Sequence, residues 1–111
     1  MTRITTHVLD TSAGRPASGM TVRLERADAT PEAPLASATT DRDGRVADWL
    51  PDGIAPGRYR LVFETGAWFR AAGRETLYGE VAVDFEVRGG VPHHHLPLLL
   101  APFGYSTYRG S

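Results

Sequence analysis

The 111-residue sequence predicts an all-β domain, a two-sheet β-sandwich with one short helix. Segments in which apolar and polar residues alternate, the period of a half-buried strand, recur along the chain. The 12 glycines and 8 prolines are spread so that they separate these short segments, as in seven- or eight-stranded β-proteins. A chain of this length accommodates one domain, which we expect to span residues 1–111.

Two strands are expected in the first part of the chain. Residues 3–10 (RITTHVLD) are rich in β-branched residues, and residues 21–25 (TVRLE) alternate apolar and polar side chains. Residues 11–19 between them contain glycine, serine and proline and are expected to form a turn. Residues 26–34 are expected to form a loop.

Two shorter strands are expected at residues 35–40 (LASATT) and 46–50 (VADWL). The intervening residues 41–44 (DRDG) end in an Asp-Gly pair, which is favoured in tight turns between strands. Residues 51–57 contain two prolines and two glycines and are expected to form a loop.

Residues 58–65 (RYRLVFET) alternate again and predict a strand. The next segment, residues 67–75 (AWFRAAGRE), has helical composition, and Gly73 limits the helix to about two turns because glycine is a poor helix former. Residues 81–87 (VAVDFEV) have the clearest period of two in the chain. If this strand lies at a sheet edge, it can pair with another subunit.

Composition excludes several classes of function. The formal net charge is −1, which argues against a nucleic-acid partner. Cysteine, lysine, asparagine and glutamine are absent, so thiol, imine and side-chain amide chemistry are not available.

The first residues (MTRITTHVLD) lack the apolar core of a signal peptide, and no apolar segment is long enough to span a membrane. We therefore expect a cytoplasmic protein with no membrane partner.

Three consecutive histidines begin the last predicted strand, residues 93–100 (HHHLPLLL). On a strand, His93 and His95 point to one face and His94 to the other. His94 shares its face with alternate leucines, namely Leu96, Leu98 and Leu100. That face is expected to be the core side, with His94 near its edge. His93 and His95 then project outward, which suggests a subunit interface or a pocket.

His7 lies in the first predicted strand, on the face that also carries Thr5 and Leu9. If it approaches His93 and His95, two chemistries are possible. Three histidines can hold a zinc ion with an open position that activates water. Alternatively, the imidazoles can act as general acid and base without a metal. The spacing of the histidines does not separate the two.

Four motifs go beyond composition: THVLDTSAGRPASG near the start, TDRDGR, HHHLPLLLAPF and the terminal YRGS. Together they resemble the 5-hydroxyisourate hydrolases, the transthyretin-related enzymes of urate breakdown, from about Thr5 to Ser111. The YRGS tail, Tyr108 to Ser111, is the most specific element, because the hormone-carrying transthyretins lack it.

The resemblance implies a transthyretin-like (prealbumin-like) β-sandwich in a homotetramer, a dimer of dimers with its sites in the channel at the dimer–dimer interface. The implied reaction opens the ring of 5-hydroxyisourate by hydrolysis and gives 2-oxo-4-hydroxy-4-carboxy-5-ureidoimidazoline, with no cofactor and no metal. The implied catalytic residues are His7, Arg45 and His95. The implied substrate-binding residues are His7, Arg45, His93, Tyr108 and Ser111.

Two positions depart from the family pattern. His94 stands where the family commonly has tyrosine, and we expect it to affect packing. Ala101 replaces the serine of the usual LSPF. Three other functions remain open at this point: a carrier of a small aromatic ligand, a zinc hydrolase using His7, His93 and His95, and a structural module in which the histidines only pack.

Overall fold

The computed structural model describes residues 1–28 and 34–111 of the chain. Within them the chain forms nine strands and one helix. In chain order the elements are β1 (Arg3–Asp10), β2 (Arg15–Pro16), β3 (Thr21–Arg26), β4 (Ala36–Thr39), β5 (Arg45–Val46), β6 (Gly57–Phe63), α1 (Thr65–Ala71), β7 (Val81–Val87), β8 (His93–Ala101) and β9 (Gly104–Thr107). Most of the expected loop at 26–34 lies outside the described residues.

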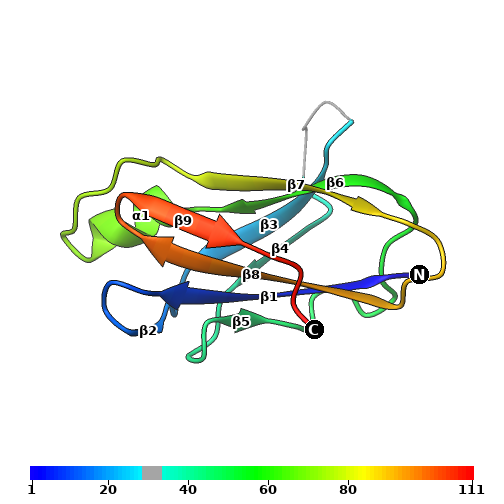
Figure 1. Cartoon of the computed structure of the whole chain (residues 1–111), viewed down its shortest axis with the longest axis horizontal. Coiled ribbons are helices and arrows are strands. Elements are labelled where there is room, and N and C mark those ends of the chain that lie inside the picture. Colours follow the sequence, from blue (N-terminus) through cyan, green and yellow to red (C-terminus); the bar gives the residue numbers. More distant parts are fainter. Residues whose placement is uncertain (29–33) are drawn as a thin grey trace.

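The strands form two sheets that face each other, so the predicted β-sandwich is confirmed (Figure 1). The first sheet has the order β2-β1-β8-β9, and β5 also pairs with β1. The second has the order β4-β3-β6-β7. All pairs are antiparallel except β1 with β8, which run parallel. Among the described residues, β7 and β9 lie at sheet edges, as the sequence suggested for β7.

The core lies between the sheets and takes the faces that the alternation predicts. On β1, Ile4 and Val8 are buried, and on β8 the alternate leucines point inward. Apolar side chains of β3 and β6, among them Val22 and Leu61, close the core from the second sheet. Because successive side chains on a strand alternate, the opposite face of β1 and β8 is presented outward. This outward face carries most of the histidines.

The expected strand at 46–50 is wrong, because only Arg45 and Val46 pair with β1. After Val46 the chain turns away. The Trp49 indole donates a hydrogen bond to the carbonyl oxygen of Ile4, and the N–H of Gly53 closes a turn on Leu50. Side-chain contacts with β1 therefore replace strand pairing in this segment.

The helix begins two residues earlier than predicted, directly after β6, and ends at Ala71. Gly73, with φ +68°, follows the helix in a conformation that favours glycine, which explains the early end. Beyond it, Arg74 forms an ion pair of 2.7 Å with the buried Asp10 at the end of β1. This contact ties the helix region to the first sheet.

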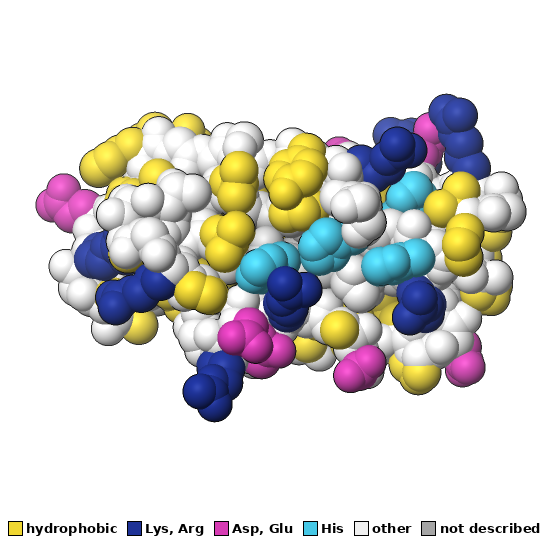
Figure 2. Space-filling view, turned by 60° about the horizontal axis from the view of Figure 1, so that its bottom comes forward, with side chains coloured by type: hydrophobic (Ala, Val, Ile, Leu, Met, Phe, Trp, Pro, Cys, Tyr) yellow, Lys and Arg dark blue, Asp and Glu magenta, His cyan; other side chains and the backbone are white. Residues whose placement is uncertain are grey.

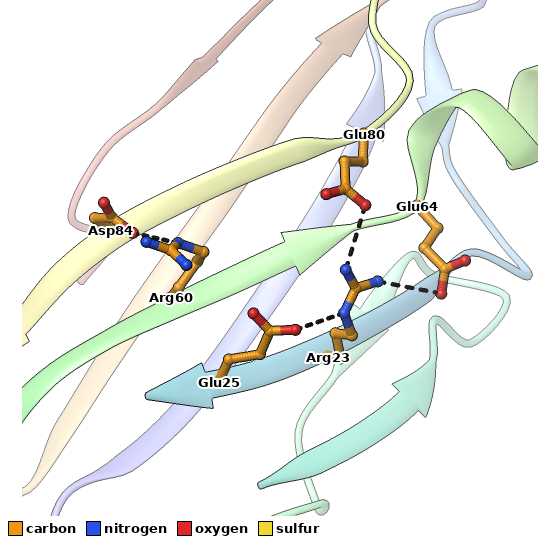
Figure 3. Close-up of polar contacts among 6 residues, drawn as sticks. All are labelled: Arg23, Glu25, Arg60, Glu64, Glu80 and Asp84. Carbon is orange, nitrogen blue, oxygen red and sulfur yellow. Dashed lines mark hydrogen bonds and ion pairs between the residues drawn. The ribbon is translucent and has the colours of Figure 1, made fainter. Parts of the chain in front are cut away.

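The outward face of the second sheet is covered with ion pairs. Arg23 reaches Glu25, Glu64 and Glu80, and Arg60 lies 2.7 Å from Asp84 (Figure 3). Such partly exposed pairs contribute little to stability but satisfy the charges of both partners.

In the part of the chain that the structure describes, no helix has the length and apolar composition needed to cross a membrane.

Candidate functional site

The candidate site lies on the outward face of the first sheet, where three strands bring polar residues together. The parallel register places Thr5 of β1 opposite His95 of β8, and the antiparallel register places His7 opposite Arg45 of β5. Side chains directly opposite each other in a sheet share a face. Histidine side chains gather across this face, with basic side chains beside them (Figure 2).

The turn that precedes β5 holds both His7 and Arg45. The Asp41 carboxylate accepts hydrogen bonds of 2.9 Å from the backbone N–H groups of Asp43 and Arg45. These bonds, from Arg45 first, hold the pKa of the Asp41 carboxyl below its ordinary value. Gly44 has φ +78°, and a side chain there would collide with the carbonyl oxygen of Val8. The turn is therefore packed directly on β1.

A contact with the same turn determines which ring nitrogen of His7 carries the proton. The Nε2 atom of His7 lies 2.7 Å from the carbonyl oxygen of Asp43. A carbonyl oxygen accepts hydrogen bonds and cannot donate them, so Nε2 must carry a proton. The neutral ring therefore has its lone pair on Nδ1, which makes Nδ1 the atom of His7 that can accept a proton from water.

His93 and His95 share one hydrogen-bond partner. Oγ1 of Thr5 lies 2.7 Å from Nε2 of His93 and 2.8 Å from Nδ1 of His95, and the two ring centroids are 6.4 Å apart. Burial lowers the pKa of His95, and unfavourable charge–charge interactions with His93, Arg45 and His7 lower it further. His95 is therefore neutral at neutral pH and able to accept a proton.

The C-terminal segment closes over His95. The backbone N–H of Gly110 donates a hydrogen bond of 2.7 Å to the carbonyl oxygen of His95, which forms an isolated bridge beyond β9. Ser111 then reaches the same cleft as Arg45 and His93. The C-terminus lies beside β5 in Figure 1, although the two segments are far apart in the sequence.

Tyr108 is not brought into this cleft within one chain. It is exposed and lines a second cleft between β7 and the β8–β9 side, together with His94 and Phe85. The alternation argument for His94 is thus confirmed, since its side chain faces away from His93 and His95 and lies at the edge of the core. The substrate-binding role of Tyr108 stays a prediction.

The cleft at the site has a volume of about 250 Å³ and is lined by residues of β1, β5, β8 and the tail, namely Thr5, Thr6, Arg45, Val46, Ala47, His93, His95 and Ser111. Ligand pockets usually measure roughly 300–1,000 Å³. One chain therefore contributes a small cleft, most of whose lining residues have polar side chains. Among residues 1–28 and 34–111, no three His, Asp or Glu side chains are arranged to hold a metal ion, so the zinc hypothesis finds no support in the ligand geometry.

Comparison with known proteins agrees with this fold and site. Residues 4–110 match the HIUase/Transthyretin family. The chain belongs to this family. It is 43% identical to the 5-hydroxyisourate hydrolase of Caulobacter vibrioides, with all of both chains covered. These matches confirm the resemblance that the four sequence motifs indicate.

Solved structures of the HIUase/transthyretin family have the same fold. The 5-hydroxyisourate hydrolase of Klebsiella pneumoniae superposes with a TM-score of 0.89 at 45% identity, over 100% of this chain and 94% of the other. The transthyretin of sea bream, solved in complex with thyroxine, has a TM-score of 0.87 at 26% identity, over 97% and 94% of the chains. The fold is therefore common to proteins named as hydrolases and as transthyretins, and function has to be argued from the site.

Sequence reasoning missed three parts of the site. The hydroxyl of Thr5, the carbonyl of Asp43 and the backbone of Gly110 all contact the histidines. Alternation on β1 had placed Thr5 on the face of His7, which was a usable signal. The contacts of Asp43 and Gly110 are made by backbone atoms. They depend on the path of the chain and cannot be predicted from residue type.

Proposed function

We propose that the chain hydrolyses 5-hydroxyisourate to 2-oxo-4-hydroxy-4-carboxy-5-ureidoimidazoline, a step in urate degradation, by metal-free acid–base catalysis. The chain is then an enzyme, like the relatives named as hydrolases. The observation that carries the proposal is the gathering of His7, Arg45 and His95 on one face of the first sheet. A carrier of apolar ligands has no need of this polar set.

Two histidines can handle the protons of the reaction. Nδ1 of His7 has a free lone pair because Nε2 donates to the Asp43 carbonyl. His95 contacts Thr5 through Nδ1, which leaves Nε2 for the substrate side. Hydrolysis requires removal of a proton from water and delivery of a proton to the leaving nitrogen, and neutral imidazoles near their pKa can do both. We propose that His7 and His95 together orient and deprotonate the water and then protonate the leaving nitrogen.

In this mechanism the guanidinium of Arg45 stabilises the negative charge that develops on the substrate. Its guanidinium presents five N–H donors in a plane and suits the planar, oxygen-rich ring of a urate derivative. Within the described parts of the chain, Arg45 takes part in no ion pair, unlike Arg23 and Arg60 on the other sheet. Since the chain has no Lys, Asn or Gln, the guanidinium of Arg45 is the cationic donor of this cleft that can stabilise an oxyanion, beside backbone N–H groups and hydroxyls.

The proposed assembly is a homotetramer with its sites at the dimer–dimer interface. The cleft of one chain is small and lies on an outward sheet face, so a second copy placed over it would exclude water. His93 and Ser111 border the cleft, and Tyr108 is proposed to bind substrate within the assembly. Activity per chain should fall on dilution as sedimentation shows the tetramer dissociating. Full activity of a monomer contradicts this part of the proposal.

A spectroscopic assay tests the reaction. Freshly generated 5-hydroxyisourate should lose its near-ultraviolet absorbance faster with the protein than by spontaneous decay, and His95→Asn should lower this rate about 10²-fold or more. His94→Asn is the matched control, because His94 faces the other cleft. A rate equal to spontaneous decay, with tight binding of an aromatic ligand instead, would indicate a carrier.

The same assay separates the metal-free reaction from a zinc-dependent one. Exhaustive chelation should leave the rate unchanged. Loss of activity on chelation, with recovery on addition of Zn²⁺, would contradict the metal-free mechanism.

The cytoplasmic location and the lack of nucleic-acid or membrane partners stay predictions from the sequence.

A further inference from the structure

The hydroxyl of Thr5 contacts two of the site histidines, His93 and His95. It lies on β1, half-buried, between the rings of His93 and His95 that project from β8. Both contacts are of hydrogen-bond length, 2.7 Å to Nε2 of His93 and 2.8 Å to Nδ1 of His95. The next residue of β1, the buried Thr6, donates to a backbone carbonyl instead. The position of Thr5 therefore links the two rings directly.

The chemistry of the three groups restricts where their protons lie. A hydroxyl has one proton to donate and can accept through its lone pairs, and a neutral imidazole has one N–H and one bare nitrogen. When the Thr5 proton is donated to one ring, the other ring must donate to Thr5. The facing atoms are Nε2 of His93 and Nδ1 of His95, so the two neutral rings are then either both Nε2–H or both Nδ1–H. The tautomers are matched.

We propose that Thr5 is a positioning residue that holds His93 and His95 as a matched tautomer pair and passes a proton between them. This inference deepens the hydrolase function proposed above and rests on it for its catalytic consequence. The matched tautomers themselves follow from the contacts of Thr5 and require no substrate.

The proton balance can be written for one turnover. In the Nδ1–H pair, Nε2 of His95 is bare and takes a proton from the attacking water. Its Nδ1 proton moves to Oγ1 of Thr5, and the hydroxyl's own proton moves to Nε2 of His93. Water has then lost one proton, His93 is an imidazolium, and His95 is neutral with a proton on Nε2.

The return of the protons completes the cycle. His95 delivers its Nε2 proton to the leaving nitrogen, while His93 returns one proton through Thr5 to Nδ1 of His95. The three groups recover their starting state, and one ring has acted first as base and then as acid. The other charged groups on this face, Arg45 and His7, are cations when charged and favour holding the extra proton away from His95.

Ring nitrogen shifts of ¹⁵N-histidine test the pairing without substrate, at about pH 8.5, two units above the ordinary histidine pKa. The wild-type protein and Thr5→Ser, which keeps the hydroxyl, should show the same tautomer on His93 and His95. Thr5→Val should change the ring shifts of both histidines. Thr11→Val is the matched control, because the Thr11 hydroxyl donates to the carbonyl of Leu100 on β8. Unlike tautomers in the wild-type protein, or unchanged shifts in Thr5→Val, would overturn the inference.

Kinetics give the second readout. Thr5→Val should lower kcat about 10-fold or more with KM within about twofold, and Thr5→Ser should restore most of the rate. If the wild-type protein hydrolyses 5-hydroxyisourate and Thr5→Val equals it in kcat, the proton relay is wrong and the hydrolase function stands. If the wild-type protein shows matched tautomers but no hydrolysis, the proposed function is wrong, and the relay through Thr5 falls with it.

Discussion

Gly110 lies against the imidazole of His95. Its N–H donates to the carbonyl oxygen of His95, and a side chain at position 110 would begin 2.5 Å from Cδ2 of the ring and 3.2 Å from Cγ. The glycine of the C-terminal segment thus allows the backbone to approach the ring closely. The position of the C-terminal segment and the position of the His95 ring therefore depend on each other.

Gly110→Ala should therefore displace the His95 ring. We expect the hydrolysis rate to fall about 10-fold or more, because small misplacement of a reacting group is costly. The melting temperature should change little, since Gly110 lies outside the core. Gly79→Ala is the control, because a Cβ there meets no heavy atom within 4 Å. Equal loss of activity in both variants would show that the contact with His95 is not the cause.

Asp41 should matter through the turn that it organises. Asp41→Ala removes the acceptor of two backbone N–H groups and should loosen both Arg45 and the Asp43 carbonyl that orients His7. We expect a clear fall in kcat/KM. Asp41→Asn keeps an acceptor oxygen and should retain most of the rate. Since the pKa of the folded Asp41 is lowered, its contribution is present above the unfolded carboxyl pKa and is lost as the pH falls through the folded value. A wild-type rate for Asp41→Ala contradicts this role.

The depressed pKa of His95 predicts an acidic limb in the pH–rate profile. Burial first, and then the charges of His93, Arg45 and His7, place this pKa below the ordinary 6.5. The rate should rise with pH through a midpoint below 6.5 and stay high at neutral pH. Arg45→Met removes one positive charge, so an NMR titration should show a higher pKa for His95. A lower pKa in that variant would contradict the electrostatic account.

The ion pair of Asp10 and Arg74 should affect stability and not the chemistry. Asp10 is 1% exposed, and burial alone would raise its pKa, but hydrogen bonds from Arg74, Ser12 and Ala13 outweigh burial and lower it. Arg74→Met leaves a buried carboxylate without its cation and should cost about 3 kcal/mol of unfolding free energy.

The pH dependence of unfolding checks this assignment. A lowered pKa in the folded state stabilises the protein above the unfolded carboxyl pKa of about 3.9, and the gain is lost as the pH falls through the folded value. Denaturant unfolding at pH 7 and at pH 3 should show a smaller difference for Arg74→Met than for the wild-type protein. Arg60→Met is the control, because its partner Asp84 is exposed. Identical pH dependence in Arg74→Met and the wild-type protein would contradict the role of the pair.

The sequence could predict the elements whose side chains alternate strongly. The bounds of β1 and β7 match the predicted 3–10 and 81–87, and the inward and outward faces of β8 follow from alternation. The strand at 46–50 failed because Trp49 bonds to the backbone of β1, a contact between distant segments that local pattern does not encode. The pairing of Arg15 and Pro16 with the end of β1 was missed because these residues lie in a Gly- and Pro-containing segment whose composition is typical of a turn.

The site was predictable in its residue types but not in its hydrogen bonds. The motifs placed His7, Arg45 and His95 together, and their registers on neighbouring strands agree. The proton on Nε2 of His7 became assignable only when a carbonyl was found facing it. The separation of Tyr108 from the cleft depends on where the chain leaves β9, which composition does not specify.

The parallel pairing of β1 with β8 has a consequence for how the protein is made. Thr5 and His95 are 90 positions apart in the chain, yet their side chains are in hydrogen-bond contact in the candidate site. A nascent chain cannot form this contact until the segment that contains β8 has been synthesised, and such long-range pairing slows folding because a large loop must close first. Until then, the edge of β1 that pairs with β8 has no partner. A nascent chain that ends before β8 therefore leaves a strand edge unpaired beside the residues of the candidate site, and such an edge is the kind of surface that chaperones protect.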